Sequence, residues 1–152
     1  MEIRDLTKEA VLIGEDATFR DAIELMVRKQ TNSLLVVDGE GKLVGEIGMS
    51  DLLNATVPEY LEPEKVLEQL STEQGFGDAV QNATFKEVKD FMTVDIEPVF
   101  VDDTLLAIAG TAIAHGTQHI PIVDRDNRPI GVISRRGLKH ILAKYLNIHD
   151  NH

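Results

Sequence analysis

An internal repeat restricts the possible folds of this chain more than any other feature. When the sequence is shifted against itself by 86 residues, residues 11–54 align with residues 97–140 without a gap. Most aligned pairs keep their apolar character, and the identical pairs include Asp16 with Asp102, Gly45 with Gly131 and Leu52 with Leu138. The chain is therefore expected to build one folding unit twice.

Each copy has the pattern of a strand, a helix, two strands joined by a turn, and a second helix. In the first copy we expect strands at residues 11–13, 33–37 and 43–47, and a helix from the N-cap Thr18 to about Gln30. In the second copy we expect strands at 99–101, 120–123 and 130–133, with helices from the N-cap Thr104 to near Gly116 and over 135–146. This βαββα order predicts an α+β fold of two repeats packed around a pseudo-two-fold axis, because one helix pair cannot cover the apolar face of a unit.

The repeat divides the chain into three segments. We place the first repeat at residues 1–56, an acidic linker at 57–83 and the second repeat at 84–148. In the linker Pro63 marks a helix start, and Gly75-Phe76-Gly77 follows apolar residues at helical spacing, so one short helix is expected. Thr84 and Glu87 have the spacing of a capping box, which predicts a helical turn at the start of the second repeat.

The composition excludes several classes of function. A formal net charge of −11 works against nucleic-acid binding, whose affinity comes largely from neutralised phosphates. The absence of cysteine excludes disulfides and thiol catalysis and makes a reducing cytoplasm the simplest compartment. No window approaches the roughly 20 apolar residues of a membrane helix, so no membrane partner is expected. The charge is uneven, since residues 127–149 contain arginines and lysines but no acid.

The two junctions between a strand and the closing helix are the candidate ligand sites. They lie at residues 45–52 and 131–138, and both contain glycine. Free backbone N–H groups at a helix start suit anions, and a carboxylate beside them can accept hydrogen bonds from the vicinal hydroxyls of a ribose. A cleft between the two copies would be the natural place for such a ligand.

The residues at these junctions resemble a known family. Each junction is similar to the Gly-x-x-Thr/Ser-x-x-Asp motif that closes the CBS domain, named for cystathionine β-synthase, in its tandem form. The segment Val88-Lys-Asp-Phe-Met-Thr93 resembles the family's Val-x-Asp-Ile-Met-Thr leader, and Ile3-Arg-Asp-Leu-Thr7 resembles a leader one residue shorter. His119-Ile-Pro-Ile-Val123 is similar to the family's strand before the hairpin.

The resemblance implies a non-catalytic regulatory module that binds AMP, ADP, ATP or S-adenosylmethionine between the copies. It also implies a homodimer in which helices meet across a flat interface, and an effector protein of unknown identity. The first site would hold ribose at Asp51, phosphate at Gly48, Met49 and Ser50, and the base at Thr7, Ala10, Leu12, Asn32, Ser33 and Leu34. The second would hold phosphate at Ser134, Arg135 and Arg136, and the base at Thr93, Ile96, Pro98, His119, Ile120 and Pro121.

Both motifs depart from the family pattern, in opposite ways. The first keeps Asp51 but has Gly48 at the hydroxyl position, whereas the second keeps Ser134 but has Gly137 at the carboxylate position. A neutral hydrogen bond contributes about 1 kcal/mol net and one to a charged group about 1.5–3 kcal/mol. The first site therefore keeps the stronger contact to ribose and is the preferred nucleoside site.

Simpler interpretations stay open at each position. Asp51 can act only as an acid at a helix start, Ser134 only as an N-cap, and Arg135 and Arg136 only as a solvated helix face. The half-lost motifs also fit a scaffold module that has lost ligand binding. The histidines lack the spacing of a metal site, and the segment 48–51 lacks the second glycine of a nucleophile elbow, so we expect neither a metal nor catalysis.

Overall fold

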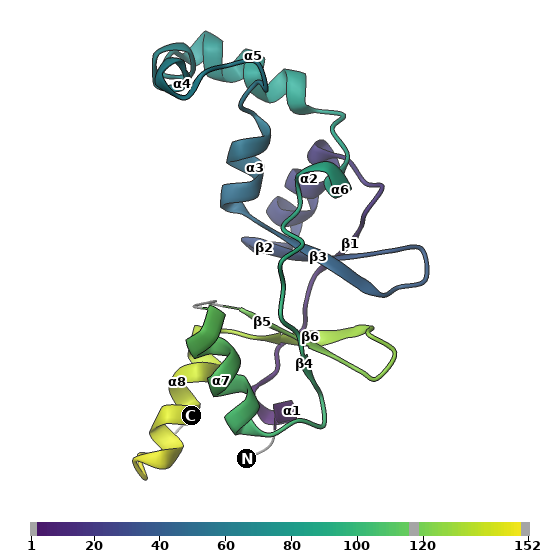
Figure 1. Cartoon of the computed structure of the whole chain (residues 1–152), viewed down its shortest axis with the longest axis vertical. Coiled ribbons are helices and arrows are strands. Elements are labelled where there is room, and N and C mark those ends of the chain that lie inside the picture. The colour runs from purple at the N-terminus through teal and green to yellow at the C-terminus, as the bar shows by residue number, and fades with distance from the viewer. Residues whose placement is uncertain (1–2, 116–118, 150–152) are drawn as a thin grey trace. The chain divides into compact units, whose positions relative to one another are not determined.

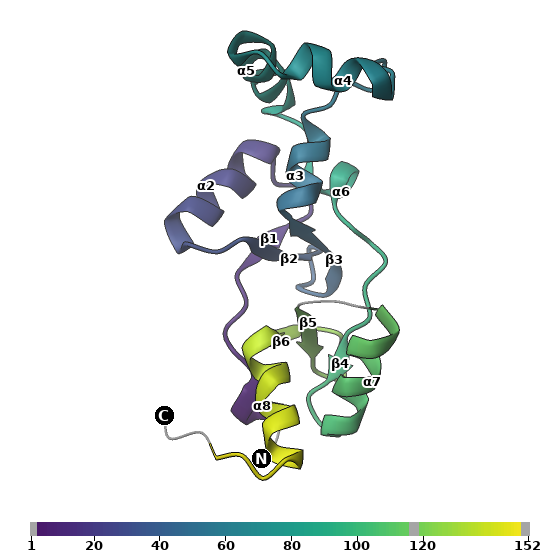
Figure 2. The ribbon, with the colours of Figure 1, turned by 90° about the vertical axis from the view of Figure 1, so that its left-hand side faces the viewer.

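The computed structural model describes residues 3–115 and 119–149, and it separates into two compact units. The first-repeat unit comprises residues 11–39 and 44–94, and the second-repeat unit comprises residues 1–10, 40–43 and 95–152. Figures 1 and 2 show the helices and strands of each unit from two directions. Gly116, the expected end of one helix, lies outside the described residues.

The first-repeat unit contains a three-stranded sheet in the order β1 (Leu12–Gly14), β2 (Ser33–Val37), β3 (Leu43–Gly48). Strands β1 and β2 are parallel because α2 (Phe19–Lys29) connects them, and α3 (Met49–Ala55) follows β3 directly. The predicted cap of α2 is confirmed, since the Thr18 hydroxyl accepts the N–H of Asp21 at 3.2 Å and the Thr18 N–H donates to the Asp21 carboxylate at 3.0 Å. Its core includes Phe19, Val36, Ile47 and Leu52.

The second-repeat unit repeats this topology. Its sheet has the order β4 (Val99–Phe100), β5 (Ile120–Val123), β6 (Pro129–Ile133), with β4 parallel and β6 antiparallel to β5. Helix α7 (Leu105–His115) connects β4 to β5, and α8 (Arg135–Tyr145) closes the unit. The core is formed mainly by isoleucines, which suit buried strands. The predicted α+β class and the βαββα order are thus confirmed in each unit.

The leader segments cross the borders of the sequence repeats. Helix α1 (Ile3–Leu6) lies at the start of the first sequence repeat but belongs to the second-repeat unit, where Lys8 forms an antiparallel bridge with Val132. Helix α6 (Val88–Phe91) lies at the start of the second sequence repeat but belongs to the first-repeat unit, where Thr93 forms an equivalent antiparallel bridge with Glu46. The borders 1–56, 57–83 and 84–148 stay a prediction about the sequence repeat, and the compact units do not follow them.

These bridges correct the expected length of the first leader. Val132 aligns with Glu46 at the repeat offset, so their bridge partners Lys8 and Thr93 are structural equivalents. Residues 3–8 therefore match residues 88–93 without a gap, and the leader is not one residue shorter. Thr7 takes the place of Met92, because each lies against the glycine of its hairpin, Gly131 or Gly45. The length difference falls after the leader instead.

The linker contains two helices, not the single one expected. They are α4 (Pro63–Leu70) and α5 (Glu73–Ala83), and the Gly75-Phe76-Gly77 segment lies inside α5. Thr72 starts α5 by accepting the N–H of Gly75 at 3.0 Å. A side chain at Gly75 would collide with the carbonyl oxygen of Gln69, so this glycine allows the close approach of the two helices and does not end one.

The expected capping box at Thr84 and Glu87 is wrong. Thr84 is the C-cap of α5, and its hydroxyl donates to the carbonyl oxygen of Gln81 at 2.6 Å. Glu87 is itself the N-cap position of α6. Thr84 caps the C-terminal end of α5 and therefore does not start the next helix. The spacing between Thr84 and Glu87 alone does not reveal that α5 extends this far.

The close packing of Lys8 against Gly131 predicts the effect of one substitution. A Cβ at Gly131 would lie 2.5 Å from the carbonyl oxygen of Lys8, and backbone cannot move aside easily. We expect Gly131→Ala to lower the free energy of unfolding by about 1–3 kcal/mol, measured by denaturant titration. The control is Gly14→Ala in β1, where a Cβ would meet nothing within 4 Å. Equal stability of the two variants would contradict this packing.

Candidate ligand site

Asp51 is the centre of the candidate site in the first-repeat unit. One carboxylate oxygen accepts the hydroxyl of Thr93 at 2.7 Å, and the other accepts the N–H of Gly48 at 2.8 Å. The residue is half-buried at the start of α3. A carboxylate offers about four acceptor positions, so two remain after these bonds. The arrangement fixes the carboxylate and leaves acceptors for a pair of neighbouring hydroxyl groups.

A second carboxylate lies close to Asp51. Burial raises the pKa of Glu46 above its usual range, and the negative charge of Asp51 raises it further. Glu46 is half-buried in β3, and its main chain pairs with that of Thr93 through two hydrogen bonds of 2.9 Å. This end of the first junction is therefore acidic, which favours hydroxyl or amino groups of a ligand over phosphate.

The other residues predicted for the first site fall into three groups. Leu12 and Ser33 lie on β1 and β2, and Ser50 is exposed on α3. Leu34 is 1% exposed in the core, so any contact it makes with a ligand must come from its backbone. Thr7 and Ala10 belong to the second-repeat unit, where the Thr7 hydroxyl donates to the carbonyl oxygen of Ile3 at 2.7 Å. Their part in the first site stays a prediction.

Two predicted residues, Asn32 and Met49, line one cavity of about 300 Å³ in the first-repeat unit. The cavity lies between α2 and α3 and is bordered mainly by apolar side chains, including Met26 and Leu52. Asp51 does not line it. Within this unit the structure thus brings Asn32 and Met49 together but separates them from the carboxylate.

The second junction keeps its hydroxyl without using it as a cap. Ser134 is at the N-cap position of α8 and makes no side-chain capping bond, while its carbonyl oxygen accepts the N–H of Leu138 at 3.0 Å. Arg136 is exposed, and the side chain of Arg135 lies outside the described part of the structure. The remaining predicted residues divide by burial: Ile120 and Pro121 are buried, whereas Ile96, Pro98 and His119 are half-buried.

The equivalents of Asp51 and Thr93 in the second-repeat unit are Gly137 and Lys8. A Cβ at Gly137 would lie 2.9 Å from Ile133 and 3.2 Å from the carbonyl oxygen of Leu6. The leader therefore occupies the space that a carboxylate would need. Thr93, which was assigned to the second site, lies instead beside Asp51 in the first-repeat unit.

Sequence reasoning missed Lys8 and Glu46. Aligning the leaders at an offset of 85 instead of 86 matches residues 3–8 with 88–93 without a gap and would have identified Lys8. Glu46 carries a weaker signal, because a charged residue between Gly45 and Ile47 in a strand reads as an ordinary solvent-facing position. Its partial burial depends on the long-range pairing with Thr93.

Two larger cavities lie away from both junctions. One of about 550 Å³ lies between α4 and α5, and one of about 420 Å³ is lined by Arg4 and by residues 101–105. Within residues 3–115 and 119–149, no three histidine, aspartate or glutamate side chains are grouped in a way that could hold a metal ion. In the same described residues no helix has the length and apolar character needed to cross a membrane.

Comparison with known families decides the classification. The family model described as "CBS domain" matches residues 3–58 and again residues 88–144. The chain belongs to the CBS domain family. Each match begins at a leader and includes the helix that follows a candidate junction, so the chain is a tandem CBS pair.

Known relatives are similar to this chain over most of its length. Protein MJ1426 of Methanocaldococcus jannaschii is 28% identical over 149 residues, covering 91% of this chain and 89% of its own length. The crystal structure of the CBS domain of a membrane protein from Sphaerobacter thermophilus is 29% identical, with a TM-score of 0.73 over 92% of this chain and 86% of that one. The structure of CBSX2 in complex with AMP is 21% identical, with a TM-score of 0.68 over 95% of this chain and 97% of that one, and shows the same fold.

Several other relatives are much longer proteins. This chain spans 21% to 29% of curated relatives that are named as enzymes or transport ATP-binding proteins. The similarity to these proteins therefore concerns only a part of each.

The raised pKa of Glu46 predicts how one variant responds to pH. Because the folded state holds this pKa above its unfolded value, Glu46 contributes most to stability at low pH, and that contribution is lost as pH rises through the raised pKa. We expect Glu46→Gln to gain stability relative to the wild type between about pH 4 and about pH 7. Denaturant titrations at both pH values measure the gain.

The matched control for this prediction is Glu59→Gln, which removes an exposed carboxylate before α4. The gain in stability of Glu46→Gln between the two pH values should exceed that of Glu59→Gln. An equal response of the two variants to pH would contradict the conclusion that burial and Asp51 disfavour the charged form of Glu46.

Proposed function

We propose that this CBS pair is a non-catalytic, cytoplasmic regulatory module that binds an adenine nucleotide or another adenosyl ligand. The observation that carries the proposal is the fixed Asp51 carboxylate, which keeps two acceptor positions after its bonds to Thr93 and Gly48. Two neighbouring acceptors match the 2′- and 3′-hydroxyls of a ribose. Ligand occupancy would act by favouring one conformation of the module over another, which requires different affinities for the two.

The proposal gives the two junctions different roles. The first junction has carboxylates at residues 46 and 51 and would recognise the nucleoside part of the ligand. The second has Lys8 and Gly137 in the places of Thr93 and Asp51, together with Ser134 and Arg136, and would favour an anionic group. The fold of the AMP complex of CBSX2 supports the choice of AMP, ADP, ATP and S-adenosylmethionine as the first ligands to test.

A scaffold module without a ligand is the second candidate. It is favoured by the packing of the second junction, where the leader fills the position of the missing carboxylate at Gly137. Calorimetric titration with the four adenosyl ligands separates the two functions. No response at millimolar concentration would reject the nucleotide proposal and favour the scaffold. Turnover of a nucleotide by purified protein would reject both.

If a nucleotide binds, Asp51→Ala should weaken its binding more than tenfold. A hydrogen bond to a charged group contributes about 1.5–3 kcal/mol, and the ribose would make two of them. Calorimetry with AMP and 2′-deoxy-AMP tests the contact directly. The wild type should prefer AMP, whereas Asp51→Ala should bind the two equally.

Two controls complete this experiment. Ser134→Ala changes the second junction and should leave the preference for AMP over 2′-deoxy-AMP unchanged. Thr93→Val removes the hydroxyl that holds Asp51 but keeps the carboxylate, so it should weaken AMP binding less than Asp51→Ala does. An equal preference for AMP in wild type and Asp51→Ala would remove Asp51 from the site.

We also propose that the module is a homodimer that acts on an effector protein. Helix α7 is apolar around its whole circumference, which is typical of a covered helix, yet Ile108 is its buried residue and Leu106 and Ile113 are 74% and 85% exposed. Leu142 and Tyr145 on α8 are also more than two-thirds exposed, at 68% and 69%. A second copy would cover these helices with the same apolar surface.

The dimer proposal predicts a large effect of one exposed substitution. Ile113→Asp should raise the dimer dissociation constant at least tenfold, because a charge would replace an apolar side chain that contributes roughly 1.5–3 kcal/mol when buried. Sedimentation equilibrium measures this constant. The control is Val94→Asp, which lies on a connecting segment and is 67% exposed. A wild type that is monomeric at every concentration would reject the homodimer.

A further inference from the structure

The α4–α5 hairpin, residues 63–83, is a feature of this chain outside both segments matched by the family model. Helix α5 attaches it to the core of the first-repeat unit through Ala83, which is 1% exposed, and through the partly buried Val80. Helix α4 contains no buried residue, although it has apolar side chains at helical spacing. A helix of eight residues is marginal in water by itself, so α4 would gain stability from a covering partner.

The outer side of the hairpin exposes large apolar side chains. Tyr60, just before α4, is 82% exposed, and Leu67 on α4 is 80% exposed. Leu67 lies one helical turn from Glu64, and Glu68 is its neighbour in sequence. Apolar side chains bordered by carboxylates form an amphipathic surface and not an ordinary solvated one.

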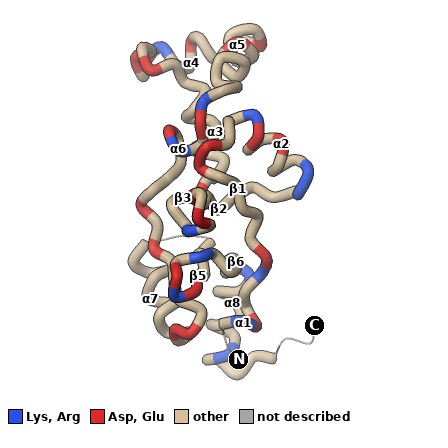
Figure 3. Tube along the Cα trace, turned by 90° about the vertical axis from the view of Figure 1, so that its right-hand side faces the viewer, with Lys and Arg blue, Asp and Glu red and all other residues tan. Residues whose placement is uncertain are grey.

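The charge of this surface is strongly one-sided. Acidic positions occur on both helices (Figure 3), and Lys65 is the single basic residue between residues 59 and 83. The Lys65 ammonium forms an ion pair with the Glu68 carboxylate at 3.7 Å, so its positive charge is already paired within the hairpin. The acids of this segment are Glu59, Glu62, Glu64, Glu68, Glu73 and Asp78.

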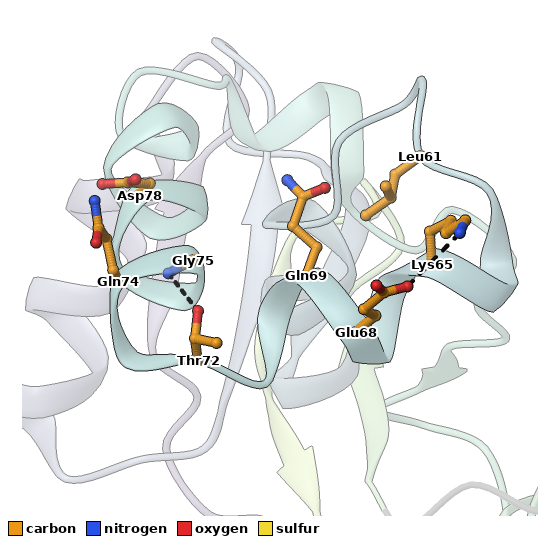
Figure 4. A pocket seen from close by; sticks show the side chains of 8 residues that line it. All are labelled: Leu61, Lys65, Glu68, Gln69, Thr72, Gln74, Gly75 and Asp78. Carbon is orange, nitrogen blue, oxygen red and sulfur yellow. Dashed lines mark hydrogen bonds and ion pairs between the residues drawn. The ribbon is translucent and has the colours of Figure 1, made fainter.

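A groove runs between the two helices. Its volume is about 550 Å³, and Lys65, Glu68 and Gln69 of α4 border it on one side, with Gln74 and Asp78 of α5 on the other (Figure 4). Carboxylates therefore lie on both sides of the groove and beside the apolar side chains of α4.

We propose that the α4–α5 hairpin is a docking surface for a basic, amphipathic helical segment of a partner protein. Arginine or lysine side chains of that segment would meet Glu64, Glu68 and Asp78, while its apolar face would cover Leu67 and Tyr60. A second copy of this chain is a poor occupant, because it would bring the same acids to the same surface. This surface is separate from Asp51, so docking and nucleotide binding can be tested independently.

The test uses the full chain and a synthetic peptide of roughly 14 leucines and lysines arranged as an amphipathic helix. A matched peptide with glutamate in place of lysine controls for apolar adhesion. Fluorescence anisotropy should show binding of the lysine peptide and none of the glutamate peptide. Hydrogen exchange should show that binding protects the amides of α4.

Two pairs of variants locate the binding. The double variant Glu64→Lys with Glu68→Lys should weaken binding of the lysine peptide at least tenfold. The double variant Glu24→Lys with Asp90→Lys makes the same change of net charge elsewhere and should have a much smaller effect. Leu67→Ser should also weaken binding, and Val94→Ser, at another exposed apolar residue, should not.

Three results would overturn the proposal. The first is an equal loss of binding in the two charge variants, which would mean that the net negative charge of the whole chain attracts the peptide and that this surface does not. The second is binding without protection of α4. The third is protection of α4 that rises with protein concentration when no peptide is present, which would assign the surface to a second copy.

Discussion

Each leader segment is joined to a hairpin by a short antiparallel bridge, and the geometry of both junctions depends on these two bridges. Lys8 exchanges backbone hydrogen bonds of 2.9 and 3.0 Å with Val132, and Thr93 exchanges two of 2.9 Å with Glu46. Both bridges need a glycine in the hairpin, because a Cβ at Gly45 or Gly131 would lie within 3 Å of the leader. The position of every side chain on the leaders relative to the closing helices follows from this pairing.

The same bridge has opposite consequences in the two units. In the first-repeat unit it brings the Thr93 hydroxyl to Asp51, which orients a carboxylate beside the half-buried Glu46. In the second-repeat unit it places Lys8 at the equivalent position and brings the main chain of Leu6 close to Gly137. A common backbone arrangement thus supports an acidic junction in one copy and a junction with basic residues in the other. This asymmetry is the physical basis for assigning nucleoside recognition to Asp51.

The α4–α5 hairpin buries much less apolar surface than the two repeats do. The repeats bury continuous apolar cores, whereas the hairpin is attached to the first-repeat core through Ala83 and Val80 of α5 and leaves α4 without a buried residue. The collision that any side chain at Gly75 would have with Gln69 shows how closely the two helices approach. The fold itself does not require the acidic and apolar surface of α4, which agrees with the docking role proposed for it.

The sequence by itself determined the repeated βαββα order, the strands β2 and β5 to the residue, and the caps at Thr18 and Thr104, because these depend on local periodicity and on contacts three residues apart. It also led to the correct family through the two closing motifs. The tertiary structure decided which leader pairs with which hairpin, that Lys8 and not Thr7 is the equivalent of Thr93, and that Thr93 holds Asp51 across 42 positions of the chain. It also decided the roles of Thr84 and Gly75, which depend on how α5 ends and how closely it packs on α4. The physical reason is that hydrogen bonds and close contacts between distant segments leave no periodic trace in the sequence of either segment.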